Sequence, residues 1–266
     1  MTVELYHGDC LDIMPTLPDH SFDAIIADLP YGTTACKWDS VIPFEKLWEQ
    51  YKRLIKKRGA IVLFGSQPFT SALVMSNVGW FKYCWYWDKV RGSNFATINI
   101  RPFNSCEDVA VFYQYQPTYN PQMRNGKPYT QKQGYVGTSK QTGLRRQNVI
   151  TKNDGTRHPL SILRFSKETG FHPTQKPVAL LEYLIRTYTN PGDTVLDNTM
   201  GSGTTMVACV NTGRDGDGIE LYPLPGKPIH KTDNPDYFGI AQGRVEKAQN
   251  EMVQLGFEEK YGIDRS

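Results

Sequence analysis

The chain has 266 residues, a formal net charge of +3 and 39% hydrophobic residues. This length suffices for one large α/β domain or for a domain with a sizeable insertion. No run approaches 18 apolar residues, and the amino terminus lacks the basic and apolar segments of a signal peptide, so we expect neither a membrane span nor secretion. The five cysteines are scattered, without a C-x-x-C pair or a zinc-spaced Cys/His cluster. These features predict a reduced, cytoplasmic protein without a metal.

The charge is distributed unevenly along the chain. Between Gln114 and Gly170 there are ten Lys or Arg residues and two acids, a local net charge of +8, whereas the other 209 residues carry 20 bases and 25 acids. A basic segment in an otherwise acidic chain is typical of a polyanion-binding surface. The alternative is that these charges only solubilise a surface loop.

Short apolar segments alternate with helical patterns over most of the chain. Strands are expected at residues 3–6, 24–27, 60–64, 81–87, 108–115, 194–196 and 216–221. Helices are expected at residues 11–17, 44–57, 68–76, 177–189, 204–211 and from 235, with Asn234 as its cap, to about 255. This alternation predicts an α/β fold with a mixed, mostly parallel sheet and helices on both faces.

Residues 115–170 interrupt this alternation. They are rich in Gln, Asn, Gly, Thr and Tyr and show no sustained period. A structureless loop of this length is unusual inside a compact domain. We therefore interpret the segment as a small inserted domain that separates residues 1–114 from residues 171–266.

An acid, a proline and an aromatic residue follow the strand expected at residues 24–27, in the motif Asp28-Leu29-Pro30-Tyr31. The carboxyl ends of strands are where open α/β sheets bind ligands. On its own, the motif is equally compatible with a turn in which the acid caps a helix and the tyrosine packs.

A glycine-containing loop, Asp197 to Thr205, joins a predicted strand to a predicted helix. Its glycines would let the backbone approach a ligand. Glu220 ends the next predicted strand, 19 residues after Gly201, a spacing typical of a carboxylate that binds both ribose hydroxyls. Because the third glycine of a dinucleotide fingerprint is missing, the pattern favours a nucleoside without a diphosphate. A plain strand-loop-helix turn is the alternative.

Three motifs together carry a family resemblance. Asp28-Leu29-Pro30-Tyr31 resembles the D-P-P-Y catalytic motif of amino-methylating DNA methyltransferases. Thr199 to Gly203 is similar to their F-x-G-x-G cofactor loop, and His172 to Pro177 to the H-P-T-Q-K-P segment before it. The order of motifs resembles the β group, which includes many phage and prophage adenine methylases. The resemblance implies a Rossmann-like S-adenosylmethionine-dependent methyltransferase fold in which residues 115–170 recognise the target.

The resemblance also implies roles for the matched residues. Asp28 and the carbonyl of Leu29 would accept the two hydrogens of the target amino group, beside Pro30, and Tyr31 would stack on the extruded base. S-adenosylmethionine would be held by residues from several segments, namely Asp9, His172, Thr174, Lys176, Asp197, Thr199, Gly201, Gly203, Thr204 and Glu220. Of these, His172, Thr174 and Lys176 are expected near its methionine end, and Asp9 near its adenine edge.

The chain departs from the family pattern at three places. Leu29 replaces a proline, a change that preserves the backbone carbonyl. Thr199 replaces a phenylalanine and alters the packing expected beneath the cofactor. A proline-rich loop at residues 222–233 lengthens the passage to the last helix. We interpret it as a surface insertion, with contact to DNA or to a second subunit as the alternative.

The expected chemistry is direct methyl transfer to an exocyclic amine. Two acceptors on the amino hydrogens would localise the nitrogen lone pair towards the methyl donor, so positioning and electrostatics supply the catalysis. Carbon-5 methylation of cytosine would need an activated cysteine, and none of the five cysteines lies in a Pro-Cys turn. Because the target atom is shielded in a duplex, the base must be flipped out.

We therefore predict a site-specific adenine-N6 methyltransferase that acts on double-stranded DNA. The DNA-contacting residues are expected to be Arg124, Lys127, Lys132, Lys140, Arg145, Arg146 and Lys152, interleaved with Tyr119, Tyr129 and Tyr135. The alternatives are a cytosine-N4 methyltransferase, against which an aspartate at position 28 weighs, and an inert DNA-binding protein with this fold. An RNA or protein amine is a weaker third alternative. Because many members of the β group dimerise, a homodimer is a possible assembly.

Overall fold

The computed structural model describes residues 1–33, 39–93, 95, 98–133, 137–138, 145–146, 149–224, 226–230 and 234–261. The chain forms two compact units, Met1–Asn120 with Ser161–Ser266, and Pro121–Leu160. The second unit is shorter than the predicted insert of residues 115–170. Residues up to Asn120 stay with the larger unit because the backbone N–H of Asn120 donates to the carbonyl of Thr187 at 2.8 Å, and its side-chain amide donates to the carbonyl of Thr189 at 3.0 Å.

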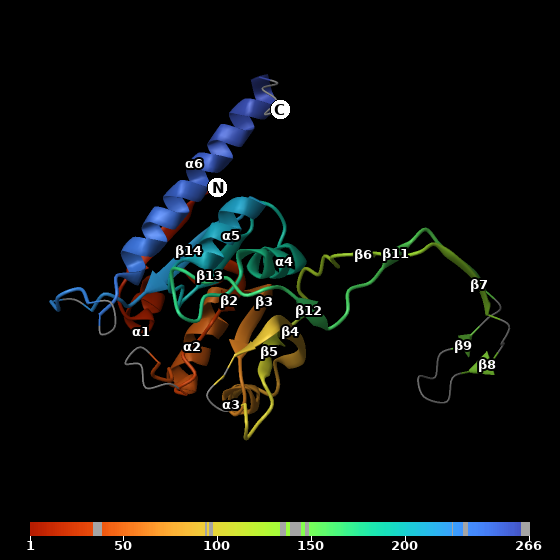
Figure 1. The fold of residues 1–266 in the computed structure, drawn as a ribbon, viewed down its shortest axis with the longest axis horizontal. Coiled ribbons are helices and arrows are strands. Elements are labelled where there is room, and N and C mark those ends of the chain that lie inside the picture. The colour runs from red at the N-terminus through yellow and green to blue at the C-terminus, as the bar shows by residue number, and fades with distance from the viewer. Residues whose placement is uncertain are drawn as a thin grey trace. The chain divides into compact units, whose positions relative to one another are not determined.

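An eight-stranded sheet forms the centre of the larger unit (Figure 1). Its strands are β1 (Val3–His7), β2 (Phe22–Ala27), β3 (Ile55–Gly65), β4 (Phe81–Ser93), β5 (Asn104–Phe112), β12 (Ile162–Arg164), β13 (Thr194–Asp197) and β14 (Asp215–Glu220). They lie in the order β1-β14-β13-β2-β3-β5-β4-β12. All neighbours pair in parallel except β5, which runs antiparallel to β3 and β4. The predicted mixed, mostly parallel sheet is confirmed.

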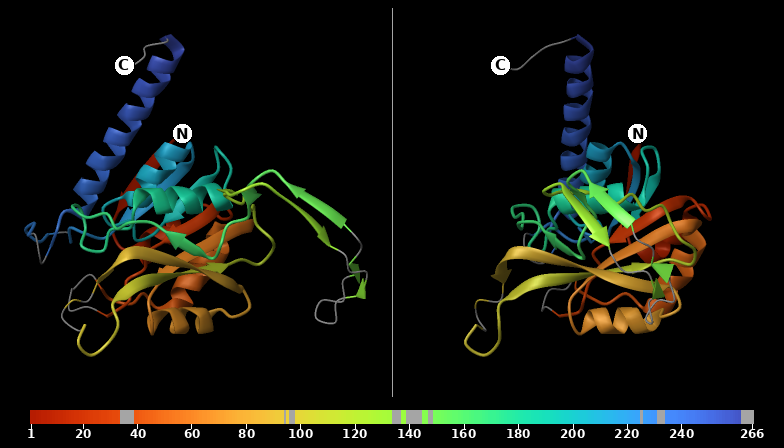
Figure 2. Two further views of the ribbon diagram at one scale, coloured as in Figure 1. Left: turned by 45° about the vertical axis from the view of Figure 1, so that its right-hand side comes forward. Right: turned by 90° about the vertical axis from the view of Figure 1, so that its right-hand side faces the viewer.

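Helices cover both faces of this sheet, also as predicted. They are α1 (Cys10–Ile13), the 3-10 helix η1 (Met14–Thr16), α2 (Phe44–Leu54), α3 (Phe69–Ser76), α4 (Val178–Tyr188), α5 (Thr204–Thr212) and α6 (Tyr237–Tyr261). The elements α4, α5 and α6 pack on one face, and α1, η1, α2 and α3 on the other. The orange and blue-green helices on opposite sides of the strands in Figures 1 and 2 show this three-layer arrangement.

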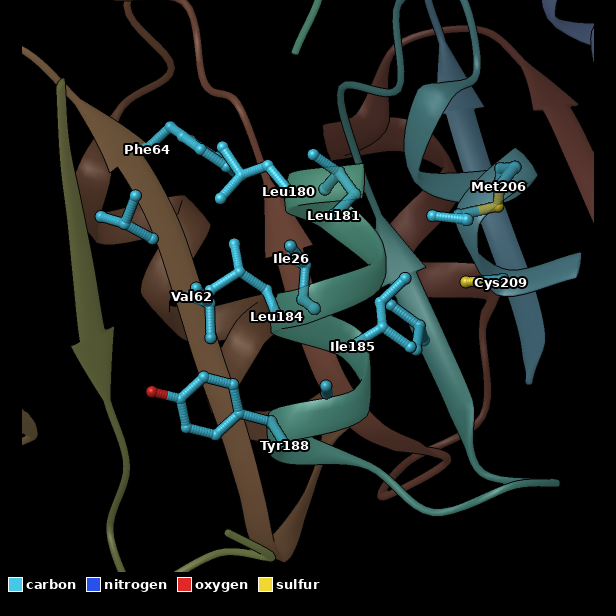
Figure 3. Packing of buried hydrophobic residues seen from close by; sticks show 14 of the residues in the cluster. Ile26, Val62, Phe64, Leu180, Leu181, Leu184, Ile185, Tyr188, Met206 and Cys209 are labelled. Atoms are coloured by element: carbon cyan, nitrogen blue, oxygen red, sulfur yellow. The ribbon is translucent and has the colours of Figure 1, made fainter. Parts of the chain in front are cut away.

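Two-sided burial explains the continuous apolar runs of the central strands. In β2, Ile26 faces α4 while its neighbour Ile25 packs with the helices of the opposite face, and both side chains are fully buried. Figure 3 shows Leu180 of α4 directed at Phe64 of β3, and Leu184 beside Val62 of β3 and Ile26. Each such side chain contributes roughly 1.5–3 kcal/mol on burial, so this layer fixes how the sheet and α4 lie together.

The connections of two neighbouring strands create a topological switch point. The chain leaves β2 through α2 to β3, and leaves β13 through α5 to β14. These crossovers run in opposite directions along the sheet and use helices on opposite faces. Because β2 and β13 are hydrogen-bonded neighbours, a crevice opens at their carboxyl ends, where such sheets bind ligands. Asp28 follows β2 and Asp197 ends β13.

Several predicted boundaries were wrong. The helix expected to reach residue 57 ends at Leu54, because Ile55 is extended and begins β3. The last helix begins at Tyr237 and not at 235. Asp236 accepts the N–H of Gly239 at 2.9 Å, whereas Asn234 is buried and ties the preceding loop by accepting the N–H of Leu224 at 2.5 Å. Asn234 was predicted to cap the last helix, but it stabilises the preceding loop instead.

Short antiparallel strand pairs make up the described part of the smaller unit. They are β6 (Arg124–Asn125) with β11 (Thr156–Arg157), β7 (Tyr129–Gln133) with β10 (Val149–Asn153), and β8 (Gly137–Thr138) with β9 (Arg145–Arg146). The guanidinium of Arg157 lies 4.7 Å from the ring centre of Tyr129 and donates to the carbonyl of Lys127 at 2.5 Å. Arg157 thus joins β11 to β7 and to the turn before β7.

The described residues were compared with two kinds of feature, membrane-spanning helices and metal-binding clusters, and contain neither. In that part of the chain, no helix has both the length and the apolar character needed to cross a membrane. The same residues hold no group of three or more His, Cys, Asp or Glu side chains arranged to bind a metal ion.

Candidate active site

A cavity of about 620 Å³ opens at the carboxyl ends of β1, β2, β3, β13 and β14 in the larger unit. Its position is the switch point between β2 and β13. The whole motif Asp28-Leu29-Pro30-Tyr31 lines it, and so do all the predicted cofactor residues except Gly203. The structure therefore brings together residues that lie up to 211 positions apart, from Asp9 to Glu220.

The Asp28 carboxylate is held on both oxygens. The Tyr31 hydroxyl donates to Oδ1 at 2.7 Å, and Lys176 Nζ donates to Oδ2. Asp39 fixes the following turn, because its carboxylate accepts the N–H groups of Gly32 and Thr33 at 2.8 and 2.9 Å. The Asp28 side chain keeps 25% of its surface exposed. It is therefore oriented but still accessible from the cavity.

Tyr31 closes one side of the motif. Its ring stacks on Phe69 of α3, with 4.9 Å between the ring centres and 29° between the planes. Burial, the nearby Asp28 carboxylate and Glu107 raise the pKa of the Tyr31 hydroxyl well above its usual value, so the hydroxyl stays a hydrogen-bond donor at neutral pH. The predicted stacking of Tyr31 on a target base remains a prediction, with one ring face covered by Phe69.

Two further charged residues near Asp28 were not predicted. Lys176 Nζ lies 3.2 Å from Glu107 Oε2, and Lys89 Nζ lies 2.5 Å from Glu107 Oε1. Lys89 and Glu107 lie on the paired strands β4 and β5, beyond the apolar runs that defined the expected strands. The sequence does hold a signal for this ion pair. Lys89 follows the apolar segment that ends at Trp87, and Glu107 precedes the one that contains Val109.

The segment before α4 contributes the other predicted side chains at the methionine end. The backbone N–H and the hydroxyl of Thr174 contact Nδ1 of His172 at 3.1 and 3.0 Å, and the His172 ring lies 4.2 Å from that of Tyr237. Burial, aided by the Lys176 cation, lowers the pKa of His172 to about 4. The imidazole is therefore neutral at physiological pH and serves as a hydrogen-bonding surface.

A second pair of carboxylates lies at the ends of β13 and β14. Asp197 accepts the N–H of Thr199 at 3.0 Å and the hydroxyl of Thr205 at 2.5 Å. Glu220 accepts the N–H groups of Gly201 and Tyr222 at 2.9 and 2.8 Å. Burial raises the pKa of each carboxyl to about 7. These acceptors match the hydroxyl and amine donors of a nucleoside with an amino-acid arm.

The two glycines of the loop have different functions. Both have positive φ, 53° at Gly201 and 76° at Gly203, where other residues are strained. A Cβ on Gly203 would lie 2.8 Å from the Cβ of Ala241 in α6, whereas a Cβ on Gly201 would be in ordinary contact with His172. Gly203 therefore lets α5 and α6 approach each other, and Gly201 faces the cavity.

The remaining predicted cofactor residues also have structural partners. The Asp9 carboxylate accepts the N–H of Leu11 at 2.8 Å and caps α1. The hydroxyl of Thr204 accepts from Arg244 Nη1 at 3.0 Å. Thr199 Oγ1 donates to the carbonyl of Asp28 at 3.1 Å. The threonine that replaces the family's phenylalanine thus connects the two motifs directly.

Most of the predicted DNA-contacting residues lie on the smaller unit. Arg124, Lys127 and Lys152 are exposed there, and Arg124 Nε donates to the carbonyl of His158 at 3.2 Å. Lys132 is on β7, and Arg145 and Arg146 form β9. Lys140 and Tyr135 lie outside the described residues, Tyr129 packs against Arg157, and Tyr119 belongs to the larger unit beside Tyr188. Their contact with DNA remains a prediction.

The cavity lies at the switch point of an α/β sheet, and its acceptors suit a nucleoside-type cofactor. The profile of the DNA methylase family matches residues 22–226, which is most of the chain, and the protein belongs to this family. The family includes methylases of adenine N6 and of cytosine N4. The family assignment agrees with the resemblance of the three motifs.

Two relatives are Type II methyltransferases. The chain is 26% identical to M.HpaI of Haemophilus parainfluenzae over 267 residues, covering 94% of this chain and 76% of the relative. It is 28% identical to M2.MboI of Moraxella bovis over 248 residues, covering 81% and 82% of the two chains. Similarity at this level extends over nearly the whole length of the protein.

Solved structures give the same fold. The complex of M1.HpyAVI with S-adenosylmethionine superposes with a TM-score of 0.59 at 28% identity, covering 91% of this chain and all of that one. The PvuII DNA methyltransferase, a cytosine-N4-specific enzyme, superposes with a TM-score of 0.61 at 16% identity over 94% and 93% of the two chains. The fold is therefore that of the S-adenosylmethionine-dependent methyltransferases, as predicted.

Proposed function

We propose that the protein is a site-specific DNA methyltransferase that transfers a methyl group to N6 of adenine. S-adenosylmethionine is its cofactor. The observation that carries the proposal is the hydrogen bond from Thr199 to the carbonyl of Asp28. It joins the loop assigned to the cofactor to the motif assigned to the target base, so both ligands would meet in one cavity.

The residues that line the cavity divide between these two ligands. Asp197 and Glu220, with the Gly201 backbone, would hold the nucleoside and the amino-acid arm of S-adenosylmethionine, which when bound supplies an electrophilic methyl group. The two acceptors of the other motif, the Asp28 carboxylate and the Leu29 carbonyl, would receive the hydrogens of the target amine. Their pull localises the nitrogen lone pair for an in-line attack, and Asp28 can take up the proton that the methylated nitrogen releases.

Double-stranded DNA is the proposed substrate, with the target base rotated out of the helix into the cavity. The basic residues of the smaller unit would hold phosphates and read base edges. The described strands of this unit form two-stranded sheets. Its charges favour a polyanion, because Asp154 is the one acid between residues 121 and 160. By analogy with the Type II relatives, we propose that the protein acts in restriction-modification.

Expression in a host that lacks DNA methylation tests this function. Genomic DNA from the expressing cells is digested to nucleosides and analysed by mass spectrometry, and modification-sensitive sequencing gives the context. We expect N6-methyladenine at one short sequence, and none with the Asp28→Ala variant. N4-methylcytosine alone would replace the assigned base while leaving the enzyme class intact.

If neither modified base is found, a measurement of cofactor binding distinguishes the remaining alternatives. If purified protein also binds S-adenosylmethionine in a calorimeter, the substrate must then be RNA or a protein amine. If it binds no cofactor, the protein is an inert DNA-binding module. Light scattering of the same preparation measures its mass and distinguishes a monomer from a homodimer.

A further inference from the structure

Four alternating charges form a chain that ends at Asp28. Lys89 pairs with Glu107 at 2.5 Å, Glu107 lies 3.2 Å from Lys176, and Lys176 donates to Asp28. The side chains of Lys89, Lys176 and Glu107 are only 4%, 7% and 14% exposed, whereas Asp28 is 25% exposed. All four residues line the cavity, and Asp28 is the most accessible of them.

We propose that Lys176, restrained by Glu107 and Lys89, is the positioning residue that presents the Asp28 carboxylate, in its ionised form, to the target amino group. The proposal deepens the proposed function and rests on it for the identity of the group that Asp28 receives. Glu107 contacts Lys176, and Lys89 contacts Glu107. None of the three is assigned to the reacting atoms.

Burial of Asp28 makes such a partner necessary. Removing a carboxylate from water favours its protonated form, and a protonated carboxyl accepts the amine hydrogens more weakly. Burial does raise the pKa of Asp28, and the Lys176 cation opposes that rise, while the nearby Glu107 carboxylate adds to it. Lys176 is thus the charge that keeps Asp28 available as an acceptor.

Glu107 sets how firmly Lys176 holds Asp28. Its Oε2 is buried and accepts no hydrogen bond of normal geometry, although Lys176 Nζ is 3.2 Å away. Glu107 and Asp28 therefore share the same ammonium, with Asp28 as the nearer of the two carboxylates. Both carboxylates raise the pKa of Lys176 against the effect of its burial, so the lysine remains charged.

The charged and titratable groups around Asp28 come from every element that packs there. They are Tyr31 of its own turn, Lys89 of β4, Glu107 and Asp108 of β5, Lys167 and Lys176 from the segment before α4, and Asp197 of β13. Only Lys176 makes a charged hydrogen bond to Asp28 among these described groups. Its removal should therefore have the largest effect on the titration of Asp28.

Titration of Asp28 by NMR tests the proposal without any need for activity. Protein labelled with ¹³C at the aspartate carboxyl carbons is titrated, and the Asp28 signal is assigned with Asp28→Asn. In Lys176→Met the midpoint should move up by about 1–3 pH units, as expected for removal of an adjacent opposite charge. In the near-isosteric Glu107→Gln it should move down, because a like charge is removed. Lys176→Arg should restore a midpoint near that of the parent.

Lys56→Met is the matched control. Lys56 pairs with Asp23 at 2.7 Å, a lysine–aspartate bond that lies outside the cavity. Its removal should leave the Asp28 midpoint unchanged. General damage to the fold would not move the midpoint in opposite directions in Lys176→Met and Glu107→Gln. If Lys176→Met fails to fold, the downward shift in Glu107→Gln and the unshifted Lys176→Arg still decide the question.

A second measurement connects the chain of charges to catalysis. Single-turnover transfer of tritiated methyl groups to plasmid DNA from a methylation-free host is followed against pH. With cofactor at saturation, the acid limb should rise in Lys176→Met and fall in Glu107→Gln by the shifts that NMR gives. NMR midpoints that do not differ from the parent would overturn the positioning role. Shifted midpoints without methyl transfer by the parent protein would instead contradict the proposed function alone.

Discussion

The two pairs of acidic residues in the cavity are stabilised in opposite ways. Asp28 and Glu107, at the side of β2 and β5, alternate with the buried cations Lys176 and Lys89. Asp197 and Glu220, at the side of β13 and β14, receive hydrogen bonds from neutral donors, namely backbone N–H groups and a threonine hydroxyl.

This contrast has a consequence for the charge of each pair. The cations hold the pKa of Glu107 below its usual range despite its burial, and Lys176 opposes the rise that burial causes in the pKa of Asp28. Burial without a paired cation raises the pKa of Asp197 and of Glu220 to about 7. The protein itself supplies the opposite charges for the first pair. The second pair becomes fully charged only above pH 7 or when a ligand supplies further hydrogen-bond donors. It therefore suits a cofactor that binds reversibly.

Replacing Asp28 by alanine should produce the largest effect and separate the two halves. Methyl transfer should fall by ~10²–10³-fold or more, as when a preorganised electrostatic group is removed from an active site. Cofactor affinity should stay close to that of the parent, because Asp28 is assigned to the base. Single-turnover transfer and calorimetry measure the two quantities. Asp19→Ala, a change at a 65% exposed aspartate, is the control, and an Asp28 variant with near-parental activity would remove Asp28 from the reaction.

Replacing Glu220 by alanine should give the opposite pattern. Cofactor binding should weaken by ~1–3 kcal/mol, roughly 5–150-fold, because a charge-assisted hydrogen bond is removed. Transfer at saturating cofactor should change much less. Glu4→Ala on the neighbouring strand β1, outside the cavity, controls for a general effect of removing a carboxylate. Unchanged affinity in the Glu220 variant would show that Glu220 contributes nothing to cofactor binding.

The pH dependence of cofactor binding distinguishes the two pairs without mutation. A carboxyl with a pKa of about 7 that must ionise to bind makes affinity high above pH 7 and progressively lower as the pH falls through 7. Between pH 8 and pH 6 the affinity should fall about tenfold if one of the two must ionise, and about a hundredfold if both must. Calorimetry in buffers of matched ionic strength measures this. A flat profile would mean that the two carboxyls bind the cofactor in either protonation state.

The site motifs could be predicted because they are local in sequence. Two of them, at Asp28 and at Asp197, lie at the ends of strands with clear apolar runs, and parallel strands place their carboxyl ends at one edge of the sheet. Asp28 and Asp197 could therefore be expected to meet. The family resemblance then supplied roles that strand positions alone do not give.

The supporting residues could not be predicted in the same way. Lys89 and Glu107 are adjacent only because β4 continues to Ser93 and pairs antiparallel with β5, and neither feature is visible in an apolar run that ends at Trp87. The strand β12 was missed because three residues in a polar segment carry no periodicity, and only pairing with β4 makes them a strand. Lys176 was assigned to the cofactor from its motif, whereas its partner here is a carboxylate 148 residues away.

The last comparison is between the cavity and the basic smaller unit. Changes in the smaller unit should have the smallest effect on methyl transfer. Changing Arg145 and Arg146 of β9 together to glutamine should weaken binding to plasmid DNA. It should also reduce the slope of log affinity against log salt by roughly 0.9 for each phosphate that the protein no longer neutralises. Methyl transfer at saturating DNA should be almost unchanged, because both residues are predicted to bind DNA and not the reacting groups.

A charge-matched change in the larger unit provides the control for this measurement. Lys52 and Lys57 each lie over an aromatic ring, Trp80 and Tyr115 respectively, and changing both to glutamine should leave the salt slope as it is. An equal decrease in both variants would indicate a general effect of net charge and contradict a binding role for the smaller unit. An unaltered slope with relaxed sequence preference in Arg145/Arg146→Gln would assign the two arginines to base edges and not to phosphates.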